Sequence, residues 1–153
     1  MSRHLPYVII IVLFSLAVFS GGIGNDFLAN WDDHQYVTAN PDIQSFTLAN
    51  LYKIFSSFYI GTYAPIQMLS YMLDYTLWGP RHFAFYLVNL GLHTLNALLF
   101  FRILCRLKLP LEWALFAVLF FMIHPVQVES VVWIAQRKNV LAVTFCLAAC
   151  WEY

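Results

Sequence analysis

The amino-acid sequence predicts an all-α protein, a polytopic bundle of membrane-spanning helices. Of its 153 residues, 61% are hydrophobic, 18% are aromatic and only 10% are charged. Soluble globular proteins carry roughly 25% charged residues, so a lipid bilayer is the expected solvent and partner. Apolar runs separated by short polar segments predict about four transmembrane helices, each needing about 20 residues, and one or two juxtamembrane helices. We expect a single membrane domain over residues 1–153.

Charge and motifs exclude several functional classes. Eight Lys and Arg balance eight Asp and Glu, so no net basic field is present to recruit a nucleic acid. The Gly-rich phosphate loop, the Gly-x-Ser-x-Gly elbow and the His-Glu-x-x-His motif of soluble enzymes do not occur. The cysteines lack the paired spacing of a zinc site or a disulfide framework and are predicted to be packing residues: Cys105, Cys146 and Cys150. We predict no metal ligands and no cofactor, and the sequence leaves the metal requirement open.

The first predicted span covers residues 6–23. Arg3 and His4 precede an apolar run that ends in a Gly-rich segment. A cleaved signal peptide has a similar layout, but no Ala-x-Ala site appears, so a retained signal anchor is the preferred interpretation. The basic N-terminus predicts that this end lies in the cytoplasm and that the chain from Asn25 onward lies outside.

Residues 24–80 are expected to form a first outer loop with juxtamembrane helices. One apolar side with helical spacing consists of Leu48, Leu51, Phe55 and Phe58. It predicts a helix lying in the membrane interface or, equally, a helix packed on the protein's own outer domain. A second helix is predicted from Pro65 to Leu77, because proline suits a first helical turn.

Residues 81–106 form the clearest predicted span, and a polar stripe runs along it. The stripe consists of His82, Tyr86, Asn89, His93 and Asn96, at spacings of four, three, four and three residues. At about 3.6 residues per turn these side chains share one face, which should point into the bundle because hydrocarbon cannot satisfy polar groups. Helix–helix hydrogen bonding is one interpretation, favoured for His93. A functional role is the other, for which His82 is the better candidate because it lies close to the outer surface.

The remaining chain is predicted to contain a span at residues 109–124, a second outer loop at 125–138 and a truncated span at 139–153. Four cations would then lie outside, against the positive-inside tendency: Lys53, Arg81, Arg137 and Lys138. Either the topology is weak or these cations have a function on that side.

Carboxylates beside cations at a membrane surface suit the transfer of a sugar from a lipid phosphate to a hydroxyl acceptor. A carboxylate from the Asp32-Asp33 pair would activate the hydroxyl as a general base, typically contributing about 10²–10⁴-fold. Cations such as Arg81, Arg137 or Lys138 would stabilise the departing phosphate. We expect Asp33 to be the reacting group and Asp32 its support.

Several ordered motifs resemble one known family: Trp31-Asp32-Asp33, Tyr63-Ala64-Pro65, Asp74 with Leu77-Trp78-Gly79, the Asn89–Asn96 helix with His93, and the run from His124 to Leu141. They are similar to the N-terminal membrane part of the tetratricopeptide-repeat O-mannosyltransferases. The resemblance implies a type C glycosyltransferase fold followed by repeats, and inverting transfer from a polyprenyl or dolichyl phosphate sugar to a protein or glycan hydroxyl. It implies a bacterial inner membrane or an endoplasmic reticulum membrane, with the site facing periplasm or lumen. An isolated N-terminal piece would be inactive.

The resemblance also assigns roles to residues of this sequence. It maps the acidic motif of the first outer loop onto Asp32 and Asp33, and the pattern of the second onto His124, Glu129 and the Arg137-Lys138 pair. The complete set of donor or substrate-binding candidates is Glu129, His124, Arg137, Lys138, Arg81, His82 and His34. Two alternatives stay open: a transporter piece whose polar groups line a solute path near mid-membrane, and a scaffold for assembling other membrane proteins.

Overall fold

The structure is a computed structural model that describes residues 3–153; residues 1–2 of the predicted membrane domain lie outside the described residues. The described chain is helical throughout, as predicted, and contains an isolated bridge between Tyr59 and Thr62 but no β-strand. In chain order its elements are α1 (Leu5–Phe19), η1 (Ser20–Gly24), η2 (His34–Thr38), η3 (Pro41–Ile43), α2 (Leu48–Ser56), α3 (Pro65–Trp78), α4 (His82–Arg106), α5 (Leu111–Ile123), α6 (Pro125–Val132), η4 (Ile134–Gln136) and α7 (Arg137–Glu152).

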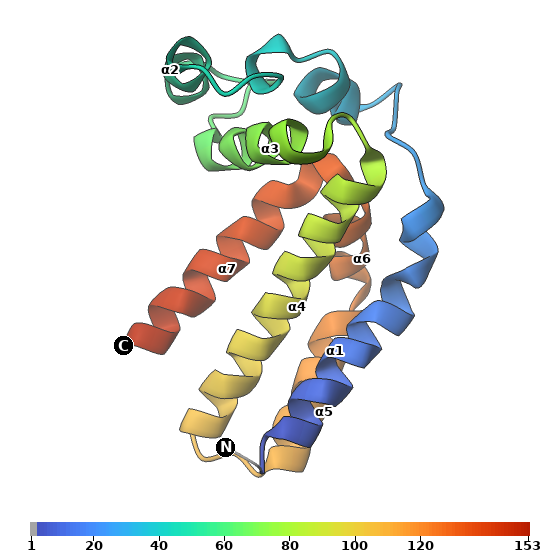
Figure 1. Cartoon of the computed structure of the whole chain (residues 1–153). Coiled ribbons are helices and arrows are strands. Elements are labelled where there is room, and N and C mark those ends of the chain that lie inside the picture. Colours follow the sequence, from blue (N-terminus) through green and yellow to red (C-terminus); the bar gives the residue numbers. More distant parts are fainter. Residues whose placement is uncertain (1–2) are drawn as a thin grey trace.

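The long helices form a bundle, and α2 and α3 lie across one end of it (Figure 1). Within residues 3–153, two segments are long and apolar enough to cross a membrane: Leu5–Gly24, with 20 residues, and His82–Arg106, with 25. The pair α5 and α6 is a third candidate only if the two helices, bent by 60° at their junction, form one broken span. The predicted span at residues 139–153 corresponds to the 16-residue helix α7 and stays a prediction.

Proline explains the bend between α5 and α6. Residues that precede a proline are pushed out of the α region by the proline ring, and His124 is accordingly extended, with φ −59° and ψ 132°. Pro125 then occupies the first turn of α6, where its missing N–H costs nothing. The predicted outer loop at residues 125–138 is therefore mostly helical, comprising α6, η4 and the start of α7.

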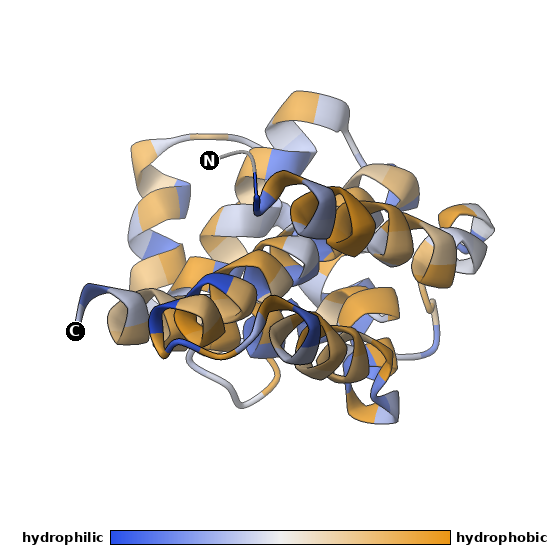
Figure 2. Cartoon of the chain, turned by 90° about the horizontal axis from the view of Figure 1, so that it is seen from below, coloured by the Kyte–Doolittle hydropathy of each residue, from blue (hydrophilic) through white to orange (hydrophobic). Residues whose placement is uncertain are grey.

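The polar stripe of α4 points into the bundle, which confirms the expected orientation. None of its members, His82, Tyr86, Asn89, His93 and Asn96, is more than 7% exposed. Asn89 donates to the Val131 carbonyl of α6 at 3.3 Å and Asn96 to the Val140 carbonyl of α7 at 3.0 Å. The Tyr86 hydroxyl donates to the Phe19 carbonyl of α1. These bonds hold α4 against its neighbours. The residues of the surrounding helices are largely hydrophobic (Figure 2).

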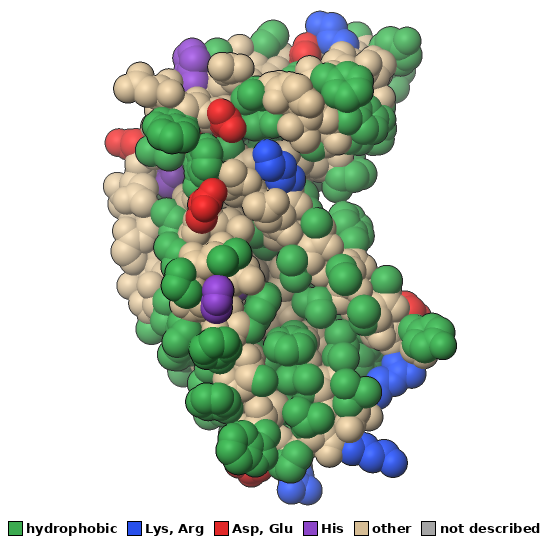
Figure 3. All heavy atoms as spheres, turned by 180° about the vertical axis from the view of Figure 1, so that it is seen from behind, with side chains coloured by type: hydrophobic (Ala, Val, Ile, Leu, Met, Phe, Trp, Pro, Cys, Tyr) green, Lys and Arg blue, Asp and Glu red, His purple; other side chains and the backbone are tan. Residues whose placement is uncertain are grey.

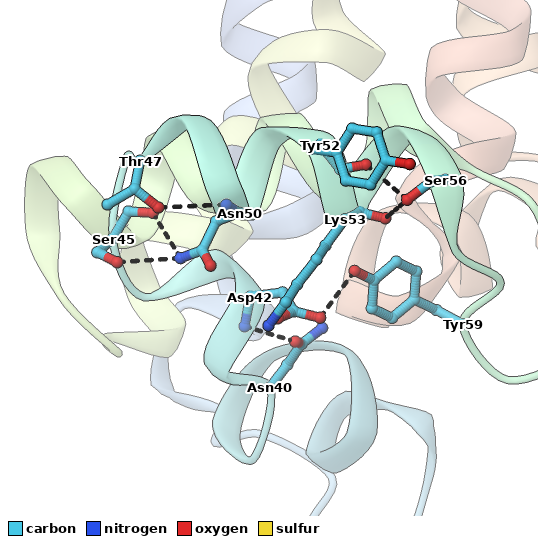
Figure 4. A network of polar contacts seen from close by, with 9 residues as sticks. All are labelled: Asn40, Asp42, Ser45, Thr47, Asn50, Tyr52, Lys53, Ser56 and Tyr59. Atoms are coloured by element: carbon cyan, nitrogen blue, oxygen red, sulfur yellow. Dashed lines mark hydrogen bonds and ion pairs between the residues drawn. The ribbon is translucent and has the colours of Figure 1, made fainter.

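A polar network fixes the outer segment that precedes α3 (Figure 4). The Asp42 carboxylate accepts from Lys53 Nζ at 3.0 Å and from the Tyr59 hydroxyl at 3.0 Å. Thr47 caps α2 by accepting from the Asn50 amide at 3.2 Å. One of the four outer cations, Lys53, thus has a structural partner.

The buried side of α2 differs from the predicted apolar stripe. Ile54 is fully buried and Leu51 packs against the core, whereas Leu48, Phe55 and Phe58 remain exposed. The helix therefore packs on the protein's own outer segment through one face. Its exposed apolar side chains leave the interfacial interpretation in place for the other face.

Candidate functional site

A cavity of about 580 Å³ opens near the end of the bundle that carries α2 and α3. It lies between the segment after η1, the first turn of α4, and α6. Its lining residues are Asn25, Asp26, Phe27, Leu28, Asp33, His82, Val128, Glu129, Val132 and Trp133. Acidic and histidine side chains gather toward this end of the face shown in Figure 3, and a group of Lys and Arg side chains lies at the opposite end.

Asp33 joins the two segments that the sequence assigns to the site. One carboxylate oxygen accepts from the Leu28 amide at 3.1 Å and the other from the Ala135 amide at 2.8 Å. Trp31 and Trp133 pack edge to face beside this connection, with ring centroids 5.6 Å apart. The first outer loop and the segment after α6 therefore meet at one carboxylate.

Burial and hydrogen bonding act in opposite directions on Asp33. The residue is only 1% exposed, and burial raises the pKa of its carboxyl above the ordinary value. The amides of Leu28 and Ala135 favour the ionised form but do not cancel this effect. A buried carboxylate with a raised pKa accepts a proton more readily than an exposed one.

His82 forms the wall of the cavity at the first turn of α4. Its ring lies edge to face against Phe27, with centroids 5.2 Å apart, and stacks on Tyr86 at 6.2 Å. The residue is 7% exposed and its Nδ1 has no hydrogen-bond partner among the described residues. A buried ring nitrogen without a partner is costly unless a ligand or water meets it, so Nδ1 of His82 is available to a molecule in the cavity.

Two further carboxylates complete the polar lining. Glu129 projects from α6, and Asp26 follows η1; both are exposed. Asp26 was not among the site residues predicted from the sequence, although it lines the cavity. Its position immediately after the first span was the available signal.

Arg137, predicted to bind the donor, does not line the cavity. It is fully buried, and its Nη1 is 2.5 Å from the Asp74 carboxylate. Nε donates to Asn89 at 2.6 Å and Nη2 to the Phe85 carbonyl at 2.8 Å, while the guanidinium lies 4.6 Å from the centre of the Tyr71 ring. Each nitrogen of this guanidinium has a partner in the protein. Asp74 neutralises the positive charge, which would otherwise be costly to bury.

The remaining candidates lie outside the cavity lining. Asp32 is half-buried and Arg81 is exposed beside His82. His34 Nδ1 shares a hydrogen bond of 2.8 Å with the Thr38 hydroxyl. Lys138 Nζ lies 5.8 Å from the centre of the Tyr36 ring, and His124 caps α6 through Nδ1 at 3.4 Å from the Val126 amide. The structure thus brings together Asp33, His82 and Glu129 from the predicted set.

Comparison with known proteins finds relatives that are all named protein O-mannosyl-transferases. The chain is 28% identical over 133 residues to the protein O-mannosyl-transferase TMTC3 of Mus musculus, covering 80% of this chain and 14% of that protein. It is 30% identical over 142 residues to TMTC2 of Mus musculus, covering 86% and 16%. It is 26% identical over 161 residues to protein O-mannosyl-transferase F38B6.6 of Caenorhabditis elegans, covering 97% and 23%.

The chain is a relative of the TMTC-like O-mannosyl-transferases. This confirms the family resemblance inferred from the motifs. No family model matches the chain and no solved structure matches it. The chain spans only 14% to 23% of the length of these three TMTC-like relatives.

Proposed function

We propose that this chain supplies the acceptor-activating half of a membrane glycosyltransferase site, in a protein that transfers mannose from a polyprenyl or dolichyl phosphate to a hydroxyl of a protein. The observation that carries the proposal is the cavity lined by Asp33, Glu129, Asp26 and His82, whose Nδ1 has no hydrogen-bond partner among the described residues. The relatives are named protein O-mannosyl-transferases, and these names suggest the sugar and the acceptor class.

The proposed reaction is an inverting single displacement. The acceptor oxygen bonds to the anomeric carbon of the sugar as the bond from that carbon to the lipid phosphate breaks. The hydroxyl proton passes to the Asp33 carboxylate, and the lipid phosphate leaves with the electron pair of the broken bond. Asp33 retains acceptor capacity for this proton, because two oxygens offer about four lone-pair sites and backbone amides use two.

The charge of the cavity supports binding of the acceptor there rather than the donor. Three carboxylates and one histidine line it, and no described Lys or Arg does so. A phosphate held here would meet repulsion from each ionised carboxylate. Donor binding therefore falls to cations outside the cavity, of which exposed Arg81 lies nearest in sequence to His82.

The transporter alternative receives less support from the structure. A solute path needs free polar groups near mid-membrane. Here Asn89 and Asn96 donate to backbone carbonyls, and the His93 ring packs against Phe19 and Phe121 with centroids 5.3 Å and 5.5 Å away. His93 Nε2 and Asn96 Oδ1 have no hydrogen-bond partner among the described residues, but neither side chain lines the cavity beside Asp33 or the cavity beside Arg102. These groups hold helices together.

The test is mannose transfer from a polyprenyl phosphate donor to an acceptor peptide, measured with the native protein in proteoliposomes. Asp33→Asn should lower the rate by about 10²-fold or more, because an amide cannot take the proton. Asp32→Asn should cause a smaller loss, as expected for a supporting residue. Glu152→Gln, at the opposite end of the bundle, should have no effect.

Asp33→Asn also disturbs the bond to Leu28 or Ala135, so folding must be checked separately. Fluorescence from Trp31 and Trp133 reports whether the two segments still meet. Glu129→Gln provides a second variant, because the Glu129 side chain makes no hydrogen bond or ion pair among the described residues. Full transfer activity in both Asp33→Asn and Glu129→Gln would refute the assignment of this cavity.

A further inference from the structure

A second cavity, of about 560 Å³, lies at the end of the bundle opposite the candidate site. It is formed where the start of α1, the end of α4 and the end of α7 meet. Its lining residues are His4, Leu5, Val8, Phe101, Arg102, Cys105, Arg106 and Trp151. Three of these side chains carry or acquire positive charge, and the others are apolar or weakly polar.

The cations of this cavity are not neutralised inside the protein. Arg102 is exposed, and neither it nor Arg106 enters an ion pair among the described residues. Arg106 lies against α7, where its guanidinium is 5.5 Å from the centre of the Trp151 ring and Nη1 donates to the Trp151 carbonyl at 2.5 Å. This contact fixes Arg106 in place but leaves its charge unbalanced.

The carboxylates at this end of the bundle lie outside the cavity lining. Glu112 accepts from the Tyr7 hydroxyl at 3.1 Å, and Glu152 follows Trp151 at the end of α7. The start of α1 adds to the positive field, because its N-cap residue His4 makes no side-chain cap bond and the first-turn amides carry partial positive charge.

The apolar walls have the arrangement that an acyl chain needs. Leu5 is 57% exposed, and Val8 follows it one turn later on α1. Phe101 of α4 forms the floor at 1% exposure. Both α1 and α4 are candidate membrane spans, so this wall continues into the part of the molecule that faces hydrocarbon.

We propose that this cavity binds one anionic phospholipid of the surrounding bilayer. The lipid phosphate lies between Arg102 and Arg106. The part of an acyl chain nearest the headgroup lies along α1 and Phe101. Basic cavities between membrane helices at the bilayer surface are suited to anionic headgroups. The proposal concerns the end of the bundle away from the mannosyl-transfer site and holds whichever way the protein crosses the membrane.

The experiment compares lipid retention in nanodiscs. The chain is reconstituted in phosphatidylcholine containing a minor fraction of phosphatidylglycerol and is then released into mild detergent. Native mass spectrometry measures which lipid stays bound to it. Wild type should retain phosphatidylglycerol in preference to phosphatidylcholine. Arg102→Gln should lower that preference about fivefold, and Arg102→Gln with Arg106→Gln should lower it by about 25-fold. Added inorganic phosphate should not displace the lipid, because it lacks the acyl chain.

Two matched controls separate a site from general attraction to positive charge. Lys108→Gln removes a cation at the same end that does not line the cavity, and Lys53→Gln removes one from the opposite end. Both should retain the lipid. Equal retention of the two lipids by wild type, or a loss in Lys108→Gln as large as in Arg102→Gln, would overturn the proposal. Arg102 makes no hydrogen bond or ion pair among the described residues, so Arg102→Gln removes the charge without breaking one.

Discussion

At the scale of single residues, Asp33 shows how one carboxylate can join two distant segments and also line a cavity. Its two oxygens hold backbone amides that come from opposite parts of the chain, and the same group faces the cavity. The sequence predicted that Asp33 would be the more important member of its pair. It could not predict the bond to Ala135, because that contact depends on how α4 and α7 pack.

The raised pKa of Asp33 predicts how stability changes with pH. The folded state holds this proton more tightly than the unfolded state, so the residue's contribution is full below its unfolded pKa, about 3.9. It is lost as pH rises through the higher folded pKa. The thermal unfolding midpoint of wild type relative to Asp33→Asn should therefore fall as pH increases from about 4 toward 7. A difference that stays constant over this range would contradict the raised pKa.

At the scale of elements, the contact between η1 and α4 positions the cavity. Gly22 lies against the Tyr86 ring, and a Cβ built at this glycine would come within 2.5 Å of that ring. Tyr86 cannot easily yield, because its hydroxyl bonds to the Phe19 carbonyl and its ring stacks on His82. The sequence indicated a Gly-rich end to the first span, but it did not show which glycine was sterically required.

Gly22→Ala should therefore destabilise the protein by about 1–3 kcal/mol, the usual cost of overpacking. Gly21→Ala is the matched control, since no atom lies within 4 Å of its Cβ position. Thermal unfolding in detergent micelles, followed by tryptophan fluorescence, measures both. A Gly22→Ala variant as stable as Gly21→Ala would show that η1 can move away from α4.

Helical periodicity and proline placement accounted for much at this scale. The polar stripe of α4 and the start of α3 at Pro65 follow from local rules. The buried face of α2 does not follow from such rules, because Leu51 and Ile54 pack against residues that only the tertiary fold brings close. Local patterns fix which residues share a face, and packing decides which face is covered.

At the scale of the whole molecule, Arg137 connects α3, which lies across one end of the bundle, to α4 and α7. It stands at the start of α7 and contacts Asp74 of α3 together with Asn89 and Phe85 of α4. Sequence analysis placed this cation in the donor site, because nothing in the local sequence shows that Asp74 reaches it. A buried cation is identified by its partner, and the partner here lies on another helix.

Arg137→Ala should lower stability by about 3–5 kcal/mol, because Asp74 is left buried and unpaired. Lys138→Ala is the neighbouring control and should cost about 1 kcal/mol or less, since only a contact with the Tyr36 ring is lost. Replacing both partners, with Arg137→Met and Asp74→Leu, should recover part of the loss. Unchanged stability of Arg137→Ala with a raised KM for the sugar donor would instead restore the donor-binding role.

The bond from Asp33 to the Ala135 amide joins positions 102 residues apart. A ribosome adds about 5–20 residues per second, so the first outer segment waits about 5–20 s for its partner to be synthesised. During that interval an acidic loop stands beside the membrane with its carboxylate only half satisfied. Synthesis of this chain therefore completes the cavity beside Asp33 late, after the helices that frame it have been made.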